Sequence, residues 1–374
     1  MLLLIWFAAV SAQAGELEDF LAGHFAGVPA ANVHLAEGWG PLESALLPEK
    51  CGTCHPQQLV DWSGSRHSMA TGPGLAGQLL DAPARFEVCN TCHAPLAEQR
   101  PLAGGAENLD SFREDLRDVG LGCASCHVRD GEMHGPPARP GRAEPGPGFP
   151  HGGYVQHDAF ESVEFCGTCH QFPETGRRVA GVLLEDTVSE WAASPWGERA
   201  EPCQTCHMPD RRHLWRGIHD PAFTEEGLTI TLASTGRTAA VYAVTSTAVG
   251  HRFPTYVTPR ITLRIWAVNA DGQVVASGEH VIQRRVPLSL AEQSFDTRLH
   301  PGESAVLPLE WRRKDHPVRV EAKLVVEPDE FYRRFFESYH SDNPDAQALI
   351  ETARQDTVDS LYEIGVRSLD LSTQ

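Results

Sequence analysis

All ten cysteines of this 374-residue chain fall in five copies of one pattern, Cys-x-x-Cys-His. Two thiols separated by two residues, with an imidazole directly after the second, are the attachment signature of c-type haem. The thiols add to the two vinyl groups of the porphyrin, and the histidine binds the iron from one side. The predicted attachment residues are Cys51, Cys54, Cys89, Cys92, Cys123, Cys126, Cys166, Cys169, Cys203 and Cys206. The predicted proximal iron ligands are His55, His93, His127, His170 and His207.

Disulfides and four-cysteine zinc ribbons are the competing uses of paired cysteines. Neither requires a histidine after every second cysteine, and no cysteine lies outside the five motifs. The sequence therefore predicts five covalently attached haem c groups.

Function depends on what occupies the sixth position of each iron. A second histidine makes the iron low-spin and suited to electron transfer, whereas an open position lets a substrate bind. The candidates stand beside aromatic residues that suit a porphyrin face, beside glycines that permit close approach, or alone within a strand-like stretch. The predicted distal ligands are His67, His151, His213, His219 and His251, with His134 and His157 in reserve. His24 and His34 are interpreted as ordinary residues of an N-terminal arm.

Two stretches of the chain echo each other. Residues 59–68, LVDWSGSRHS, resemble residues 187–197, TVSEWAASPWG, with a Trp and a Ser at matching places. Where the first stretch has His67, the second has Trp196. Either a turn was duplicated and lost its ligand, so that another segment supplies that imidazole, or these are two unrelated amphipathic turns.

The elements that position the motifs change character along the chain. Residues 15–222 are expected to form a mostly α or irregular multihaem domain with short helices after each motif, because the porphyrins supply much of the core. The Pro- and Gly-rich stretch 135–153 should be an extended loop. Residues 223–327 alternate apolar and polar side chains, with a hairpin signal at 269–272, and predict an antiparallel immunoglobulin-like β-sandwich. Residues 328–374 are expected to be helical.

The N-terminus and the net charge bear on location and partners. An apolar run from Leu2 to Val10, followed by small residues at 12 and 14, predicts a signal peptide over residues 1–14, although no basic residue precedes it. Export to the periplasm or beyond the cell is expected, with no membrane-spanning segment after cleavage. The formal charge of −19 argues against nucleic acid and anionic lipid, and favours redox-partner proteins with basic surfaces.

The runs CGTCHPQQLVDWSGSRHS, CQTCHMPDRRHLWRGIHD and GHRFPT resemble the multihaem cytochromes c of the cytochrome c554-like group. The resemblance covers roughly residues 45–260. It implies bis-histidine haems stacked in close pairs that work as an electron conduit. It supports His67, His213, His219 and His251 as distal ligands, and His151 more loosely. Five motifs exceed the four of the namesake carrier, and the β-rich region is additional.

Three functions follow from these observations. The first is an electron-transfer protein without catalytic residues. The second is an enzyme that reduces or oxidises nitrite, hydroxylamine or a sulfur oxyanion at one open haem, although the Cys-x-x-Cys-Lys motif typical of penta-haem nitrite reductases does not occur. The third is a self-associating subunit of an extracellular cytochrome filament. The sequence favours the first.

Overall fold

The chain folds as two compact units that interleave along the sequence. The structure is a computed structural model that describes residues 15–25, 39–103, 106–107, 111–129, 131–143 and 145–371. The first unit comprises residues 1–169, 202–215 and 340–352, and the second comprises 170–201, 216–339 and 353–374. The sequence analysis expected contiguous domains, with residues 170–201 in the multihaem domain and residues 340–352 in the C-terminal helical segment. The structure instead assigns 170–201 to the second unit and 340–352 to the first. The predicted signal peptide and His34 lie outside the described residues.

The first unit consists of short helices joined by turns. Residues 15–24 are helical, and several later helices begin at a proline, whose fixed φ suits the first helical turn. The helices with bounds in this unit are α2 (Pro48–Cys51), α3 (Pro56–Ser63), η1 (Arg66–Met69), α4 (Pro73–Asp81), α5 (Pro83–Phe86), η2 (Glu87–Cys89), α6 (Asn90–His93), η3 (Ala97–Gln99), η4 (Glu114–Leu116), α7 (Cys123–His127), η5 (Pro150–Gly152), η6 (Asp158–Glu161), α8 (Val163–His170, its last residue in the second unit), α11 (Cys203–His207) and η7 (Pro209–Arg211). The strands are β1 (Leu102–Ala103), β2 (Ala106–Glu107), β3 (Val128–Arg129), β4 (Glu132–Gly135) and β5 (Val155–Gln156). Sparse regular structure in this region confirms the expectation.

The glycine-rich stretch 135–153 is irregular between β4 and η5 over its described residues. Gly153 has φ +90°, and a Cβ at this position would lie 2.6 Å from the backbone nitrogen of Gly146. Only glycine fits so close a backbone approach at that φ. The expected extended loop is confirmed.

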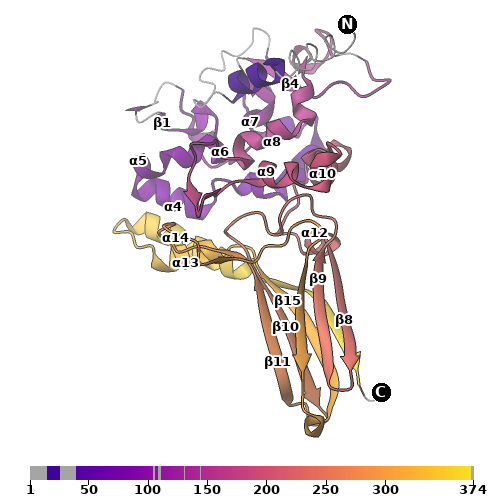
Figure 1. The fold of residues 1–374 in the computed structure, drawn as a ribbon. Coiled ribbons are helices and arrows are strands. Elements are labelled where there is room, and N and C mark those ends of the chain that lie inside the picture. Colours follow the sequence, from indigo (N-terminus) through magenta and orange to yellow (C-terminus); the bar gives the residue numbers. More distant parts are fainter. Residues whose placement is uncertain are drawn as a thin grey trace. The chain divides into compact units, whose positions relative to one another are not determined.

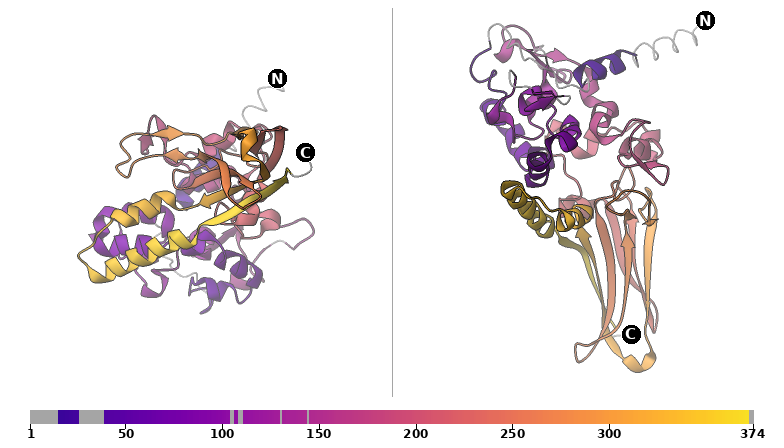
Figure 2. Two further views of the ribbon diagram at one scale, coloured as in Figure 1. Left: turned by 90° about the horizontal axis from the view of Figure 1, so that it is seen from below. Right: turned by 90° about the vertical axis from the view of Figure 1, so that its left-hand side faces the viewer.

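The second unit is built on two antiparallel sheets (Figures 1 and 2). One has the order β14-β9-β8 and the other β11-β10-β15-β16. Alternate residues of β14 are buried, as expected for a strand with one face on the core. Both sheets contribute to one hydrophobic core, which includes Tyr242, Ile261, Leu263 and Leu324. The strands are β8 (Leu228–Gly236), β9 (Ala239–Ser246), β10 (Arg260–Asn269), β11 (Val274–Ile282), β14 (Ser304–Glu310), β15 (Pro317–Glu327) and β16 (Tyr362–Asp370).

Smaller elements complete the second unit. The predicted hairpin turn at 269–272 joins β10 to β11, and Gly272 has the positive φ that such a turn requires. The remaining elements are β6 (Arg178–Val179), β7 (Val182–Leu183), α9 (Thr187–Ala192), α10 (Pro195–Glu198), α12 (Pro221–Glu226), β12 (Arg284–Arg285), β13 (Phe295–Asp296) and η8 (Arg313–Asp315). Among the described residues, none of the helices has the length and apolar character needed to cross a membrane.

The C-terminal prediction was right for two helices and wrong for the last segment. Helices α13 (Glu330–Ser338) and α14 (Pro344–Asp359) form as expected, but residues 362–370 are strand β16, not a helix. The segment pairs with β15, and Gly365 with φ +61° lies under the hydroxyl of Tyr242, which donates a 2.7 Å hydrogen bond to the Gly365 carbonyl. The edge of β15, remote in sequence, decides this conformation.

Candidate functional site

The five Cys-x-x-Cys-His motifs lie on short helices or tight turns. The third and fifth motifs are the helices α7 and α11 themselves, and the fourth ends α8. Helical backbone places residues three and four apart on one face, so both sulfurs and the imidazole of a motif point the same way. All ten thiols are free of disulfides.

The surroundings of the motifs fit a large apolar group. Val60, just after the first motif, is 66% exposed, and Val88, just before the second, is 71% exposed. The apolar core that joins α7 to its neighbours is small and consists of Leu46, Leu96, Leu116, Ala124 and Val128. Porphyrin faces would cover exposed apolar side chains of this kind and add the missing core.

Hydrogen bonds orient three of the proximal histidines. Nδ1 of His127 lies 2.8 Å from the carbonyl of His134, and Nδ1 of His93 lies 2.7 Å from that of Ala70. Nδ1 of His170 lies 2.5 Å from the hydroxyl of Tyr256. A bond at Nδ1 makes Nε2 the nitrogen that would bind iron, as is usual for ligating histidines.

The ring of His213 lies near that of His127, the predicted proximal histidine of the third motif. The ring centroids of His127 and His213 are 6.1 Å apart, and the rings are inclined by 37°. Two imidazoles on opposite sides of one metal, each with a metal–nitrogen bond of about 2 Å, have centroids about 6 Å apart. Burial lowers the pKa of His127 to about 4 and lowers that of His213 as well, so both rings are neutral, as ligands must be.

A buried carboxylate holds His213 in place. Arg212 binds Asp61 through two hydrogen bonds of 2.6 and 2.5 Å, and the backbone N–H of His213 donates to the same carboxylate at 3.1 Å. These bonds outweigh burial and lower the pKa of Asp61. The sequence analysis missed Asp61 and Arg212. The signal for them was an acid directly before a tryptophan and an arginine directly before a candidate ligand.

His151 lies close to His55 of the first motif. Burial lowers the pKa of His55, and the nearby charge of His151 lowers it further. Nδ1 of His151 is 2.7 Å from the carbonyl of Gly153, which again makes Nε2 the nitrogen for iron. His55 and His151, 96 residues apart in sequence, therefore lie within electrostatic range of each other.

The ring of His67 packs against an indole. Its ring lies 4.6 Å from Trp215, and the His213 ring lies 5.0 Å from the same indole. Trp62 is buried, and its indole N–H donates to the carbonyl of Leu121 at 2.8 Å. Trp215 therefore suits the porphyrin-facing role expected for a tryptophan near His67 better than the buried Trp62 does.

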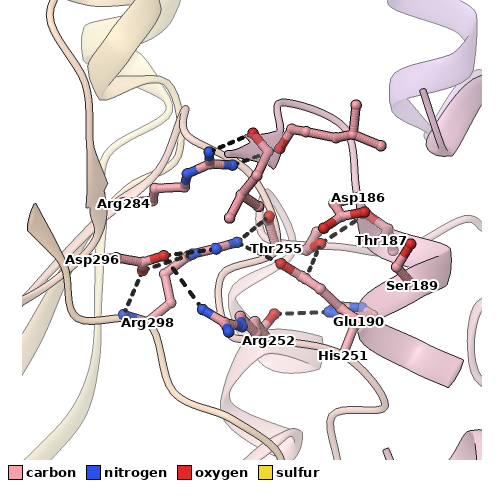
Figure 3. A network of polar contacts seen from close by, with 12 residues as sticks. Asp186, Thr187, Ser189, Glu190, His251, Arg252, Thr255, Arg284, Asp296 and Arg298 are labelled. Atoms are coloured by element: carbon pink, nitrogen blue, oxygen red, sulfur yellow. Dashed lines mark hydrogen bonds and ion pairs between the residues drawn. The ribbon is translucent and has the colours of Figure 1, made fainter. Parts of the chain in front are cut away.

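The two remaining predicted distal ligands lie in the second unit. Nε2 of His219 is 2.8 Å from a carboxylate oxygen of Asp329, so iron binding through that nitrogen would require this contact to break. Nδ1 of His251 is 2.9 Å from the carbonyl of Arg252 (Figure 3). Burial lowers the pKa of His251, which keeps the ring neutral.

Of the two reserve histidines, His134 contacts the third motif and His157 packs on Phe20. The His157 ring stacks on Phe20 at 3.7 Å, and the carbonyl of His134 accepts the hydrogen bond of His127. His24, expected to be an ordinary arm residue, is 5% exposed, and its Nε2 lies 2.7 Å from the carbonyl of Cys126. Burial, followed by the charge of Arg129, lowers the pKa of His24 to about 3. Nothing in the local sequence around His24 pointed to this burial.

Contacts between cysteines connect the motifs within the first unit. Three pairs of thiols from different motifs lie close enough for each thiol to shift the pKa of the other: Cys51 with Cys123, Cys92 with Cys169, and Cys166 with Cys203. Cys126 lies near enough to Cys166 and Cys169 for its charge to raise the pKa of both thiols further. The first motif therefore adjoins the third, the third adjoins the fourth, and the fourth adjoins the second and the fifth.

Residues 50–128, which hold the first three motifs, match the family described as cytochrome c554 and c-prime. Over these residues the chain is similar to the multihaem cytochromes c of the c554-like group. Its fold is similar to that of a penta-heme cytochrome c552 from Thermochromatium tepidum, with 19% identity, a TM-score of 0.61, and coverage of 88% of this chain and 100% of the other.

The other comparisons with known proteins say little about this chain. A glycosyl hydrolase family 2 member from Bacteroides cellulosilyticus aligns over 28% of this chain and 12% of its own, with 14% identity and a TM-score of 0.16. Among curated proteins, none matches the chain.

Proposed function

We propose that this chain is an exported pentahaem c-type cytochrome that relays electrons between redox partners through bis-histidine haems. Haem c, when bound, supplies an iron that takes up and releases one electron. The observation that carries the proposal is the contact between motifs, which leaves none of the five isolated. Groups attached at adjoining motifs would be neighbours, and the fourth motif would be the junction of three of them.

The pairing of histidines supports electron transfer over substrate binding. The spacing of His127 and His213 supports bis-histidine ligation at the third motif, and the proximity of His151 to His55 supports it at the first. His67, His219 and His251 remain the candidates for the other irons. An iron with two imidazoles has no open position for nitrite, hydroxylamine or a sulfur oxyanion.

Location, partners and the class of the β region belong to the same proposal. Export follows from covalent haem attachment together with the N-terminal apolar run. A charge of −19 favours redox partners with basic surfaces, whose encounter it would accelerate at low salt. The arrangement of three and four antiparallel strands supports an immunoglobulin-like sandwich.

Paramagnetic resonance of the fully oxidised protein tests the proposal. We expect five low-spin ferric irons, with a protein mass that corresponds to five attached haems. Addition of cyanide, nitrite or hydroxylamine should leave the visible spectrum unchanged. A stoichiometric high-spin iron that binds one of these ligands would contradict the relay and favour an enzyme with one open haem. Size-exclusion chromatography that shows polymers instead of small particles would favour the filament.

A further inference from the structure

The two echoing stretches form the same hydrogen-bonded arrangement. In the first, the indole of Trp62 donates to the carbonyl of Leu121 at 2.8 Å, and the Leu121 N–H donates to the carbonyl of His67 at 3.0 Å. In the second, the indole of Trp191 donates to the carbonyl of Glu201 at 2.8 Å, and the Glu201 N–H donates to the carbonyl of Trp196 at 3.0 Å. The paired residues are 59 apart in the first case and 10 apart in the second, so the match is not a by-product of equal loop length. We call these arrangements the first and second clamps.

The hydrogen bonds of each clamp hold the backbone just before a Cys-x-x-Cys-His motif. Leu121 stands two residues before Cys123, and Glu201 stands two residues before Cys203. The residue ahead of each has a positive φ, +70° at Gly120 and +51° at Ala200. The backbone thus enters both motifs in the same conformation, which favours duplication over two unrelated turns.

The correspondence extends to an acid directly before each tryptophan. In the first clamp, Asp61 binds Arg212 and the backbone of His213, the histidine that faces His127. In the second, Glu190 accepts hydrogen bonds of 2.7 Å from the hydroxyl of Thr255 and from Arg298 (Figure 3). Each acid therefore fixes a segment that carries a candidate distal histidine.

The segment fixed by Glu190 is the loop that carries His251. Arg298 joins this loop to the clamp, because the same guanidinium donates to Glu190 at 2.7 Å and to the carbonyl of Thr255 at 2.6 Å. Asp296 neutralises Arg298 through two bonds of 2.9 Å. The side chains of Arg298 and Glu190 are only 1% and 6% exposed, so the loop is held by a buried charged pair.

Trp196 occupies the place of His67 and leaves the second clamp without its own imidazole. A Cβ on Gly250 would lie 3.4 Å from Cγ of Trp196 and 3.7 Å from Cδ1 of Trp191. The residue directly before His251 therefore packs on both indoles of the clamp. With Nδ1 of His251 bonded to the Arg252 carbonyl, Nε2 is the nitrogen that would bind metal.

We propose that residues 186–201 are a second haem clamp, in which Glu190 and Arg298 are positioning residues that hold His251 as an axial iron ligand. The proposal rests on the histidine ligation in the proposed function and does not depend on electron relay. When haem is bound, His251 would offer the Nε2 lone pair to the iron, whereas Glu190 and Arg298 act on the loop that carries His251.

Spin-state counts on the intact, fully loaded protein test this assignment. In His251→Ala, we expect one of the five ferric irons to change from low-spin to high-spin, and added imidazole to restore the low-spin signal. In Glu190→Gln, a fraction of one iron should become high-spin, and Glu190→Asp should recover most of the low-spin signal. Glu174→Gln is the matched control, because Glu174 is an exposed acid paired with Arg178 in the same unit, and its spectrum should equal that of the unchanged protein.

His251→Met keeps the proposal testable if the alanine variant does not fold. A methionine retains an axial ligand and raises the potential of its haem, so one of the five midpoint potentials should rise while all irons stay low-spin. Five low-spin irons in His251→Ala with five haems attached, or unchanged potentials in His251→Met, would overturn the assignment of His251. A Glu190→Gln spectrum identical to that of Glu174→Gln would overturn the positioning role. A high-spin iron already present in the unchanged protein would count against the relay and leave these comparisons intact.

Discussion

At the scale of single residues, the proposed ligation of iron would be divided between local and distant parts of the sequence. The proposed proximal ligand follows its cysteines directly, whereas the second imidazole would come from elsewhere in the chain, as His213 would for His127. Asp61 and Arg212 bridge this distance with charged hydrogen bonds. The geometry of this proposed iron site would therefore depend on three separate stretches of chain.

Replacement of His213 tests this pairing. We expect His213→Ala to convert one of five low-spin irons to high-spin, because the His127 iron loses its second imidazole, and exogenous imidazole to reverse the change. Paramagnetic resonance and the visible spectrum measure it. His316→Asn serves as the control, since His316 is exposed, lies in the left-handed region that asparagine tolerates, and should leave all five irons unchanged. If His213→Ala shows no gain of high-spin iron, the pairing of His213 with His127 is wrong.

The sequence leads directly to a prediction of the attachment residues, because that chemistry needs only a five-residue pattern. It could propose distal histidines only as a set, because pairing depends on which loops meet in space. His24 shows the limit most clearly, since its burial against Cys126 depends on the docking of a helix more than a hundred residues away in sequence. Asp61 was missed because an acid beside a tryptophan more often lies on a solvated face.

At the scale of elements, helix α13 is tied to the neighbouring loops by charge. Glu330, at its start, accepts hydrogen bonds from Arg285, from Arg334 and, at 2.9 Å, from Gln283. Its side chain is 3% exposed. Burial alone would raise the pKa of Glu330, but the bond from Arg285 and the charges of Arg334 and Arg285 outweigh it and lower the pKa.

This carboxylate gives stability a defined dependence on pH. Because the pKa in the folded state lies below the ordinary value of about 4.3, the stabilisation is present above that value and is lost as pH falls through the folded-state pKa. We expect Glu330→Gln to lower the free energy of unfolding by about 1–3 kcal/mol at pH 7. Denaturant unfolding of both proteins between pH 7 and pH 3 should show the difference shrinking below about pH 4. A difference that stays constant over this range would show that the charge of Glu330 is not its source.

The C-terminal segment shows why elements are less predictable than motifs. Residues 330–359 carry helical periodicity, and that local signal was sufficient for α13 and α14. Residues 362–370 become a strand because β15 offers a free edge, with Ile364 opposite Leu324. Local propensity yields to strand pairing where a buried sheet lacks a neighbour.

At the scale of the whole molecule, the two units are stabilised by different kinds of core. The second unit buries side chains from both of its sheets, among them Tyr242, Ile261, Ile265 and Leu324, each fully buried. The motif region of the first unit has the small cluster around Leu116 and leaves Val60 and Val88 exposed. Apolar burial is the main favourable term in folding, so we expect the first unit to depend on attached haem far more than the second does.

Protein made without haem attachment should therefore fold in one part only. Amide hydrogen exchange followed by mass spectrometry should find β8–β11 and β14–β16 as protected as in the loaded protein, because their ladders and core need no cofactor. Amides of residues 48–127 should exchange close to the rate of an unfolded chain, and those of the loaded protein under the same conditions should be protected. Strong protection of residues 48–127 without haem would mean that side chains alone supply the core of that region. Attached haem would then contribute little to the stability of the fold there.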